Sequence, residues 1–535
     1  MKPHVRLKDL ARNDTLPLFD VAALPLKPLP QGFTDTGVEP NWKPLSESVR
    51  QGCECELDNA CALSFPRPKT REDEAELVEA FVRGLQKLFE KENNWTFLQP
   101  LLLTMENCVG CQTCADSCHI FESSGRVEPY RPTFRSEVLR RLYFKYVKGG
   151  GVLSTLQHGE LELNWPMIAR LAELSYRCNL CRRCAQACPM GADNALVTHE
   201  LRKLFSQEMG IAPKELHERG SMLQLKSGSS TGMTPRTVRD NIDFIDGDIS
   251  EKTGVEVHTP WDVEGADVLL IHNAGEILAW PENPGAFALI LNTAGIKWTL
   301  SSELVGYDSI NYGVWYDDAQ FARVALRHAE VARKLKVKKI VIGECGHAHK
   351  ALAVVADRLL QGGHDIPRES SLTLLREIVR SGRLDLDPSR NDFPVTLHDP
   401  CNLVRLMGVV EPQREILRRI APQFREMTPH GVDNYCCGGG SGFAIMSPNN
   451  FGDWRAKVSG RKKLEQIVNA FGDCLDASTL KYVCAPCSNC KGQIRDLFVY
   501  HDVWKRHRIF YGGIAELIVN AMRKVKPGFI DWEWH

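Results

Sequence analysis

The sequence lacks the features that define several large classes of protein. No stretch approaches the ~18 consecutive apolar residues of a membrane-spanning helix, so we expect a chain that does not span the bilayer by itself. Lys+Arg (66) and Asp+Glu (67) balance to a net charge of −1, which offers no basic surface and argues against nucleic acid as a partner. A Walker A loop is missing, and any Gly-rich dinucleotide signature after a predicted strand is weak, which argues against direct use of nucleotide or NAD.

The start of the sequence also gives no reason to expect a secretory leader. The first residues, MKPHVRLKDLARNDTLPLFD, carry positive charges but no continuous apolar segment, so we expect a cytoplasmic location. Cysteine, in contrast, is plentiful. The 19 cysteines among 535 residues fall mostly into tight C-x-x-C runs, not into the scattered pairs of a disulfide framework. This spacing is typical of thiolate metal ligands in a reducing compartment.

The N-terminal half divides into three predicted regions. Residues 1–95 form an arm and a helix: 1–69 are rich in Pro and Gly without periodicity, whereas Thr70 is a candidate N-cap for a helix with Leu77, Phe81, Leu85 and Leu88 on one face. Residues 96–226 contain two four-cysteine runs and indicate a small α-helical domain. Residues 227–265, which open with SGSSTG and contain Pro235, are predicted to be an interdomain linker.

The remaining residues, 266–535, alternate short apolar strands with helical stretches. This alternation favours parallel α/β units, in which functional sites collect at the carboxyl ends of the strands. The halves 266–380 and 390–535 form a weak internal repeat, because each ends on a strand that enters a cysteine loop, KIVIGECGHAHK and KYVCAPCSNCK. The predicted fold class is α+β multidomain, with an α-helical ferredoxin-like domain followed by a pseudo-twofold α/β domain.

The two four-cysteine runs have the spacing of ferredoxin-like ligands for cubane [4Fe–4S] clusters. In this spacing three thiolates wrap one cluster, and the fourth cysteine reaches the neighbouring cluster. The predicted ligand sets are Cys108, Cys111, Cys114 and Cys188 for one cluster, and Cys178, Cys181, Cys184 and Cys118 for the other. Two adjacent clusters indicate single-electron relay without specifying a reaction.

A pair of zinc sites is the alternative, because four cysteines also suit Zn²⁺. Two copies of a 2-2-3 spacing are difficult to explain in that way. The first run has His119 where the second has Pro189, and since proline is not a ligand, we expect this difference to change loop geometry and not the cluster.

A second group of cysteines lies near the C-terminus. Thiols in HDPCNL, YCCGGGSG and CAPCSNC follow predicted strands, and Gly438–Gly440 let the backbone approach closely, as a metal–sulfur site requires. The order Cys, Cys-Cys-Gly, Cys-x-x-Cys resembles the CCG domain of heterodisulfide reductases. In that family a complete CCG motif holds a non-cubane [4Fe–4S] cluster that cleaves a disulfide in two one-electron steps.

The resemblance implies which residues hold this third cluster and carry the catalysis: Cys401, Cys436, Cys437, Cys484 and Cys487. Cys490 is an extra thiol that could be a ligand, a bystander or a structural contact. A zinc site or buried free thiols are the alternatives for the whole group.

The first half of the repeat departs from the CCG pattern, since it keeps only Cys345 in GECGHAHK. Cys345 could face the surviving site across the pseudo-twofold as a further ligand. His347, and His349 beside it, could supply protons to a leaving thiolate, or could simply be a hydrogen-bonded histidine pair.

Four other cysteines lie outside these motifs. Cys53, Cys55 and Cys61 form an incomplete metal set, and we expect unligated thiols unless a fourth ligand comes from elsewhere. Cys474 is predicted to be structural.

The combined motifs are similar to HdrD-type proteins, and within that family to the DsrK-type subunits of DsrMKJOP membrane complexes. This resemblance implies peripheral attachment to the inner membrane through a DsrM-like haem-b subunit and other DsrJOP-like subunits. It also implies a small DsrC-like thiol protein with a disulfide or trisulfide as substrate. The alternatives are Hmc/Tmc-type subunits, or dehydrogenase electron-relay subunits that link a flavin or cytochrome partner to quinone without thiol chemistry.

Overall fold

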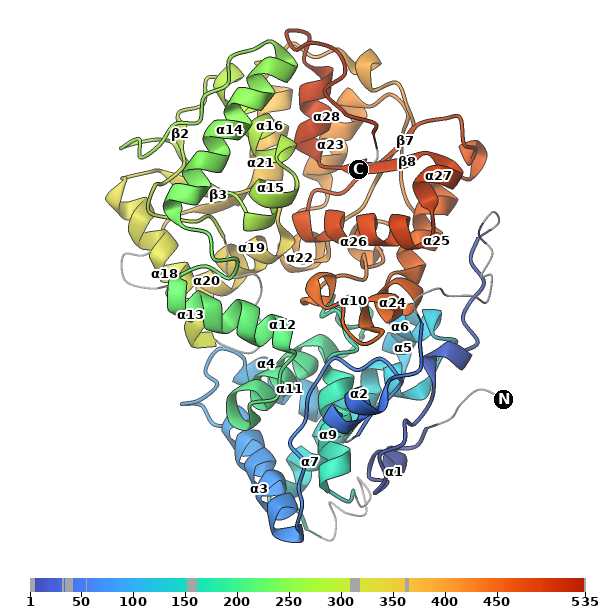
Figure 1. Ribbon diagram of the computed structural model, residues 1–535. Coiled ribbons are helices and arrows are strands. Elements are labelled where there is room, and N and C mark those ends of the chain that lie inside the picture. Colours follow the sequence, from blue (N-terminus) through green and yellow to red (C-terminus); the bar gives the residue numbers. More distant parts are fainter. Residues whose placement is uncertain are drawn as a thin grey trace. The chain divides into compact units, whose positions relative to one another are not determined.

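The computed structural model describes residues 5–30, 33, 42–53, 55–151, 161–307, 318–360 and 365–533. It separates into two units, shown as a ribbon in Figure 1. The helical unit comprises the described residues up to His217 together with Gly438–Glu465. The α/β unit comprises the described residues of 218–307, 319–437 and 466–533.

The helical unit is built from short and medium helices without strands among its described residues. Its helices are α1 (Leu7–Leu10), α2 (Glu47–Gly52), α3 (Arg71–Leu88), α4 (Leu98–Asn107), α5 (Thr113–Ser117), α6 (His119–Ser123), α7 (Pro132–Tyr146), α9 (Trp165–Ser175), α10 (Arg183–Gln186), α11 (Asn194–Met209), α12 (Lys214–Leu216) and α24 (Phe451–Trp454). The 3₁₀ turns η1 (Val21–Ala23), η2 (Glu128–Tyr130) and η7 (Phe443–Ile445) and the π-helical segment η8 (Arg455–Ser459) complete it.

Helix α3 begins where the sequence predicts it. Thr70 is the N-cap, and a capping box with Asp73 satisfies backbone N–H groups at the helix start. The face that carries Phe81, Leu85 and Leu88 is buried. It packs against α11, the helix around which α4, α7 and α9 also assemble.

The N-terminal arm is held to the helical unit by one buried arginine. Arg170 in α9 is fully buried and its guanidinium donates hydrogen bonds to backbone carbonyls of the arm, namely those of Asp9, Leu10, Arg12, Asp14 and Leu16. Parts of the predicted arm, residues 1–4, 31–32, 34–41 and 54, lie outside the described residues.

A buried ion pair connects the arm to the second cysteine run. Arg177 precedes Cys178, and its guanidinium donates to both carboxylate oxygens of Asp58 at 2.9 Å. Tyr130 also donates to Asp58. Because both charged side chains are almost completely buried, each charge depends on the other for compensation.

The α/β unit contains two parallel four-stranded sheets with the same strand order. The first has the order β2-β1-β3-β4 and the second β6-β5-β7-β8. The strands are β1 (Val268–Ile271), β2 (Trp298–Thr299), β3 (Lys339–Ile342), β4 (Arg368–Ser370), β5 (Val395–Leu397), β6 (Phe424–Arg425), β7 (Lys481–Cys484) and β8 (Ile509–Gly512). The internal repeat and the α+β fold class are therefore confirmed.

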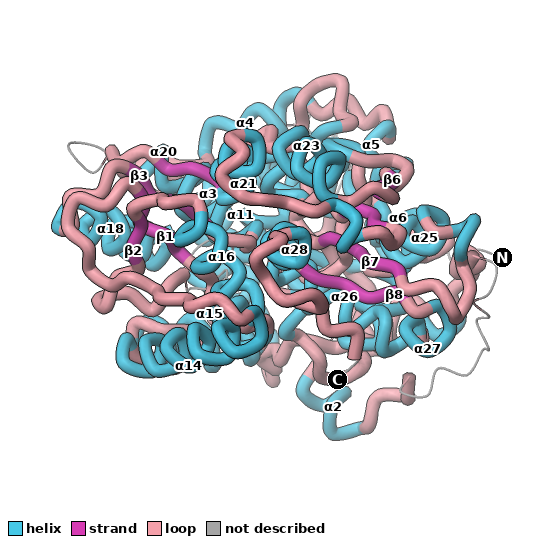
Figure 2. Tube along the Cα trace, turned by 90° about the horizontal axis from the view of Figure 1, so that it is seen from above, coloured by secondary structure: helices cyan, strands magenta, loops and turns pink. Residues whose placement is uncertain are grey.

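Helices connect the strands and form the core between the sheets. They are α13 (Leu223–Ser227), α14 (Pro235–Thr253), α15 (Ala274–Ala279), α16 (Glu282–Thr293), α18 (Asp318–Lys334), α19 (Gly346–His349), α20 (Ala356–Leu359), α21 (Ser371–Arg380), α22 (Cys401–Leu406), α23 (Glu411–Ile420), α26 (Ser488–Tyr500), α27 (Val503–His507) and α28 (Ile514–Ala521). The unit also contains the 3₁₀ turns η5 (Pro388–Asn391), η6 (Gly431–Asp433) and η9 (Gly472–Cys474). Its π-helical segments are η3 (His217–Met222), at the start of the unit, and η4 (Lys350–Val355). Helix α25 (Arg461–Ala470) begins in the helical unit and ends in this one. Figure 2 shows α16 and α28, which pack against each other, between the two sheets.

The region predicted as a linker is partly helical, which corrects that expectation. Residues Pro235–Thr253 form the 19-residue helix α14, with Thr234 as its N-cap. Val238, Ile242, Ile245 and Ile249 are buried in the core of the α/β unit. Their i, i+4, i+7 spacing is typical of a helix. The SGSSTG segment before them led to the prediction of a linker instead.

The register of the two sheets gives a residue-by-residue match between the halves. Ile271 pairs with Ile342 in the first sheet, and Leu397 pairs with Cys484 in the second. Counting onward from these strand ends, His272 matches His398 and Gly275 matches Cys401. By the same count Ile342 matches Cys484, Cys345 matches Cys487, and Ala348 matches Cys490. The first half therefore keeps one of the four cysteines found at these positions of the second half.

Candidate iron–sulfur sites

The two four-cysteine loops of the helical unit have the same unusual backbone. Gly110 and Gln112 in the first loop have φ of 68° and 66°, and Leu180 and Arg182 at the corresponding positions of the second have φ of 50° and 60°. A leucine with positive φ is strained and persists only where its surroundings impose it. Turns of this kind direct successive N–H groups into a concave anion site, as at many iron–sulfur clusters.

Electrostatic interactions connect cysteines of one loop with cysteines of the other. Burial, and then the nearby Cys108 and Cys188, raise the pKa of Cys114 to about 11. Burial is also the main cause that raises the pKa of Cys118 to about 12, and Cys178 and Cys181 of the other run act in the same direction.

Cys184 completes the second set. Burial is the largest cause that raises its pKa well above the usual value, and Asp193 and then the nearby Cys178, Cys181 and Cys118 act in the same direction. Each fourth cysteine thus lies in the electrostatic neighbourhood of the opposite run. Such gathered thiols are costly as free thiolates, and bound iron would compensate their charge.

His119 has a structural contact of its own. Its Nε2 lies 2.8 Å from Oδ1 of Asn179, the residue after Cys178, so the histidine joins the two loops. Asn179 also donates to the carbonyl of Gly438 at 3.0 Å. Since Gly438 directly follows Cys437 in the chain, the segment after the paired cysteines is anchored on the second cysteine loop.

Three of the CCG cysteines lie at the carboxyl ends of β5 and β7, whereas Cys436 and Cys437 follow η6. His398 follows β5, and its backbone N–H donates to the carbonyl of Cys484, the last residue of β7, at 2.8 Å. Cys401 is the first residue of α22, and Cys487 is the N-cap of α26. Parallel strands therefore bring separated parts of the chain to one edge, as open α/β sheets do.

Four sulfur atoms at this edge interact directly. Cys437 forms hydrogen bonds with Cys436 and Cys490, which are the main causes that lower its pKa well below the usual value. Hydrogen bonds to Cys437 and Cys487 raise the pKa of Cys490 strongly, and the bond to Cys490 is the largest cause that lowers that of Cys487. Cys490, left open by the sequence, thus lies in the middle of the group.

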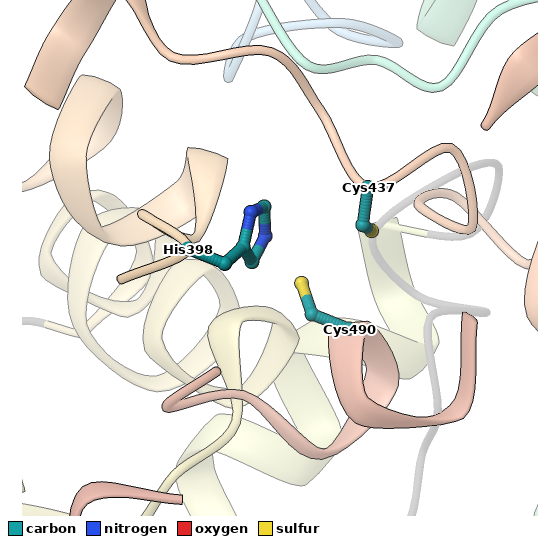
Figure 3. Close-up of side chains that lie close together, drawn as sticks. All are labelled: His398, Cys437 and Cys490. Atoms are coloured by element: carbon teal, nitrogen blue, oxygen red, sulfur yellow. The ribbon is translucent and has the colours of Figure 1, made fainter. Parts of the chain in front are cut away.

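A histidine is part of the same group. Ligand atoms of His398, Cys437 and Cys490 all lie within 4.8 Å of one another, and all three residues are buried. Figure 3 shows the imidazole directed toward the two sulfur atoms. His398 was not predicted from the sequence, although its place directly after a strand and before Asp399-Pro400-Cys401 was an available signal.

The loop that carries His398 and Cys401 is fixed by a buried ion pair. Asp399 accepts hydrogen bonds from Nη1 and Nη2 of Arg414 at 2.9 and 2.6 Å and from the backbone N–H of Gly431 at 2.7 Å. Burial alone would raise the pKa of Asp399, but the bonds from Arg414 more than offset it and the pKa is lowered. The carboxylate is therefore held in its charged form.

Cys345 faces the site from the first half of the repeat. The backbone N–H of the next residue, Gly346, donates to Sγ of Cys487 at 3.2 Å. Burial, and then the neighbouring Cys487, raise the pKa of Cys345. Cys345 thus lies beside the group, as expected from the pseudo-twofold.

The two histidines of GECGHAHK have different surroundings. His349 has its Nδ1 2.7 Å from the carbonyl of Cys345 and its Nε2 2.9 Å from Oγ of Ser370, which is the arrangement of a structural histidine. His347 interacts electrostatically with Cys437, and burial lowers its pKa to about 4. Burial also lowers the pKa of His349 to about 4, so both imidazoles are neutral near pH 7.

Of the cysteines outside the motifs, two are paired. Cys53 and Cys61 form a disulfide with an S–S distance of 2.09 Å, so the expectation of unligated thiols is wrong for them. Cys55 is buried and takes no part in this bond. Cys474 lies half-buried beside Arg425, outside the sulfur group.

The donors present fit iron–sulfur clusters. Thiolates are the ligands that such clusters use, and imidazole can replace two of them in Rieske centres. The helical unit supplies the eight cysteines of the two runs, and the α/β unit supplies buried sulfur atoms with a histidine.

Comparisons with known proteins agree with this arrangement. The model of a 4Fe-4S dicluster domain matches residues 104–192, and the model of a cysteine-rich CCG domain matches residues 395–495. Together with the fold, these matches define an iron–sulfur protein with a dicluster domain and a CCG domain.

Similar chains narrow this class. The chain is 26% identical over 490 residues to Hdr-like menaquinol oxidoreductase iron-sulfur subunit 2 of Archaeoglobus fulgidus, with 83% of each chain covered. It is 27% identical over 464 residues to the Hdr-like menaquinol oxidoreductase iron-sulfur subunit of Archaeoglobus profundus, covering 78% of this chain and 79% of the relative.

A third relative belongs to a heterodisulfide reductase. The chain is 26% identical over 358 residues to one of the subunits of the dihydromethanophenazine:CoB–CoM heterodisulfide reductase of Methanosarcina acetivorans, covering 65% of this chain and 81% of the relative. The comparisons support the HdrD-like family and an oxidoreductase with an electron-transfer role. Within the described part of the chain, no helix is both long and apolar enough to cross a bilayer.

Proposed function

We propose that this chain is the catalytic iron–sulfur subunit of a membrane-bound complex and exchanges electrons with a disulfide or trisulfide. In this proposal the crossed cysteine sets of the helical unit hold two cubane [4Fe–4S] clusters. Cys401, Cys436, Cys437, Cys484 and Cys487 hold a non-cubane [4Fe–4S] cluster. When bound, this cluster would provide an iron centre that meets substrate sulfur.

The observation that carries the proposal is the group of interacting sulfur atoms at the carboxyl edge of β5 and β7. Hydrogen bonds lower the pKa of Cys437 and Cys487, so two of these sulfurs favour the thiolate form that iron binds. Cys436, Cys437 and Cys490 are all at least 95% buried, a setting in which unbound thiolates would be costly.

The overall reaction is balanced by two electrons and two protons, which convert one S–S bond into two thiols. Electrons arriving one at a time through two clusters suit such a two-step reaction. His347 is buried and interacts electrostatically with Cys437, and it is our candidate for supplying a proton to the leaving thiolate.

The proposed setting follows the DsrK-type resemblance. The partners would be a DsrM-like haem-b membrane subunit, DsrJOP-like subunits and a DsrC-like thiol protein, with the chain peripheral on the cytoplasmic side of the inner membrane. The relatives from Archaeoglobus are named menaquinol oxidoreductase subunits, which supports a quinol-linked membrane partner.

The same names favour a second candidate, an electron relay between a cytochrome or flavin partner and quinone without thiol chemistry, as in Hmc/Tmc-type subunits. The two candidates differ in whether a substrate thiol alters the third cluster. Only the first requires sulfur from outside to reach it.

The test is iron and sulfide analysis, together with EPR spectroscopy, of the anaerobically purified full chain. Three clusters require about twelve iron and twelve sulfide per chain. We expect a DsrC-like thiol protein to change the EPR signal of the oxidised chain, and Cys437→Ser to abolish that change. Cys474→Ser is the matched control, because Cys474 lies outside the sulfur group. About eight irons, or a signal indifferent to thiols, would refute the proposal.

A further inference from the structure

We propose that His398 and Cys490 are themselves ligands of the CCG iron–sulfur site, which makes its donor set a mixture of nitrogen and sulfur. This inference rests on the proposed function, because it assigns further ligands to the same cluster. It adds a residue type that the CCG motif does not contain.

The first argument is distance. Ligand atoms of His398, Cys437 and Cys490 lie within 4.8 Å of one another. Two ligands of one tetrahedral metal ion, with bonds of about 2.1 Å to nitrogen and 2.3 Å to sulfur, lie roughly 3.6 Å apart. The three side chains are thus within a small side-chain adjustment of sharing one iron, or of binding adjacent irons. In Figure 3 the imidazole and both sulfur atoms converge from three separate chain segments.

The second argument is that His398 is held in this position. The backbone N–H of His398 donates to the carbonyl of Cys484. The side chain of the next residue, Asp399, accepts hydrogen bonds from Arg414 and from the backbone N–H of Gly431. The Asp399 carbonyl also accepts a hydrogen bond from Asn434 at 3.1 Å. A residue whose backbone is fixed on both sides presents its side chain with little freedom, as metal ligands require.

The third argument comes from the other half of the repeat, which serves as an internal control. His272, the match of His398, has its Nδ1 2.8 Å from Oε2 of Glu276. The match of Glu276 in the CCG half is Asn402. Where the cysteines are missing, the histidine is paired with a carboxylate, and where they are present, that carboxylate is replaced and the histidine faces sulfur.

The same comparison groups Cys490 with the ligands. Its match is Ala348, just as the matches of Cys401 and Cys484 are Gly275 and Ile342. Each of these three cysteines is therefore absent from the half that lacks a CCG motif. The sulfur of Cys490 forms hydrogen bonds with two predicted ligands, Cys437 and Cys487, and so lies where a ligand would lie.

Pulsed EPR of the full chain, labelled with ¹⁵N-histidine and purified anaerobically, tests the nitrogen ligand. We expect the signal of the third cluster to carry the strong nitrogen coupling of iron-bound imidazole, converted from ¹⁴N to ¹⁵N by the label. His398→Gln should abolish this coupling. His349→Gln is the matched control, since His349 is equally buried but bonded to Cys345 and Ser370, and should leave it unchanged.

The sulfur ligand is tested by Cys490→Ser. We expect it to shift the g-values of the third cluster, whereas Cys474→Ser should not. If His398→Gln fails to retain the cluster, the labelling of the unmodified chain decides alone.

The outcomes separate the two levels of the proposal. The His398 assignment would be overturned if the third cluster showed no histidine nitrogen coupling, or if the coupling survived His398→Gln. The proposed function would remain intact in that case, provided that the chain holds about twelve irons and its signal responds to thiols. Unchanged g-values in Cys490→Ser would overturn the Cys490 assignment in the same way. Zinc in this site, with about eight irons per chain, would overturn both the inference and the proposed function.

Discussion

Removing the carboxylate of Asp399 should destabilise the α/β unit strongly. The side chains of Asp399 and Arg414 have relative exposures of 0% and 2%, and two hydrogen bonds join them. Asp399→Ala leaves the buried guanidinium with Glu426 as its remaining acidic partner. Breaking a buried pair on one side costs about 3–5 kcal/mol. For a unit of this size that corresponds to a decrease of roughly 6–20 °C in Tm.

The assay is thermal unfolding followed by circular dichroism under anaerobic conditions, with iron analysis of each sample. Glu426→Ala is the matched control, because Glu426 binds the same arginine but is 26% exposed, and it should cost less than about 1 kcal/mol. The double variant Asp399→Ala/Arg414→Met should be more stable than Asp399→Ala alone, since it leaves no uncompensated charge. The reasoning fails if Asp399→Ala lowers Tm no more than the control, or if the double variant is the least stable.

Two further predictions concern the helical unit. Burial raises the pKa of Glu56 to about 7, so the folded chain keeps a proton that the unfolded chain releases above its ordinary value of 4.5. The free energy of unfolding should therefore fall as pH rises from 4.5 to about 7. Urea unfolding midpoints measured across this range should show the decrease, and Glu56→Gln should remove it. An unchanged slope in the variant would contradict the raised pKa of Glu56. Arg170→Met removes the hydrogen bonds to the arm, so hydrogen exchange of the amides of Leu7–Leu10 should accelerate while the iron content stays constant. Equal protection in the variant and the unmodified chain would show that other contacts hold the arm.

The sequence could predict the parts of the molecule that depend on local spacing. Both cysteine runs, the helix after Thr70 and the alternation of strands with helices follow from patterns a few residues long. The matching halves were visible because each ends on a strand that enters a cysteine loop. The identical strand order of the two sheets is the three-dimensional form of that repeat.

Features that depend on long-range contacts could not be predicted. Arg170 lies more than 150 positions from the carbonyls that it binds, and no local pattern marks such an arginine. His398 was missed because a single histidine after a strand has no spacing to test. Helix α14 is a different case, because its apolar periodicity is a local signal; it was missed because the Gly/Ser-rich segment before it was given more weight.

The match between the two halves indicates why we propose one CCG cluster in this domain and not two. In the first half, Gly275 and Ile342 occupy positions that hold Cys401 and Cys484 in the second. The first half nevertheless contributes to the surviving site, because the amide of Gly346 binds the sulfur of Cys487. A hydrogen bond to a ligand sulfur influences the reduction potential of a cluster. In the proposed site, the half without its own set of ligands would therefore contribute to the electronic environment of the cluster held by the other half.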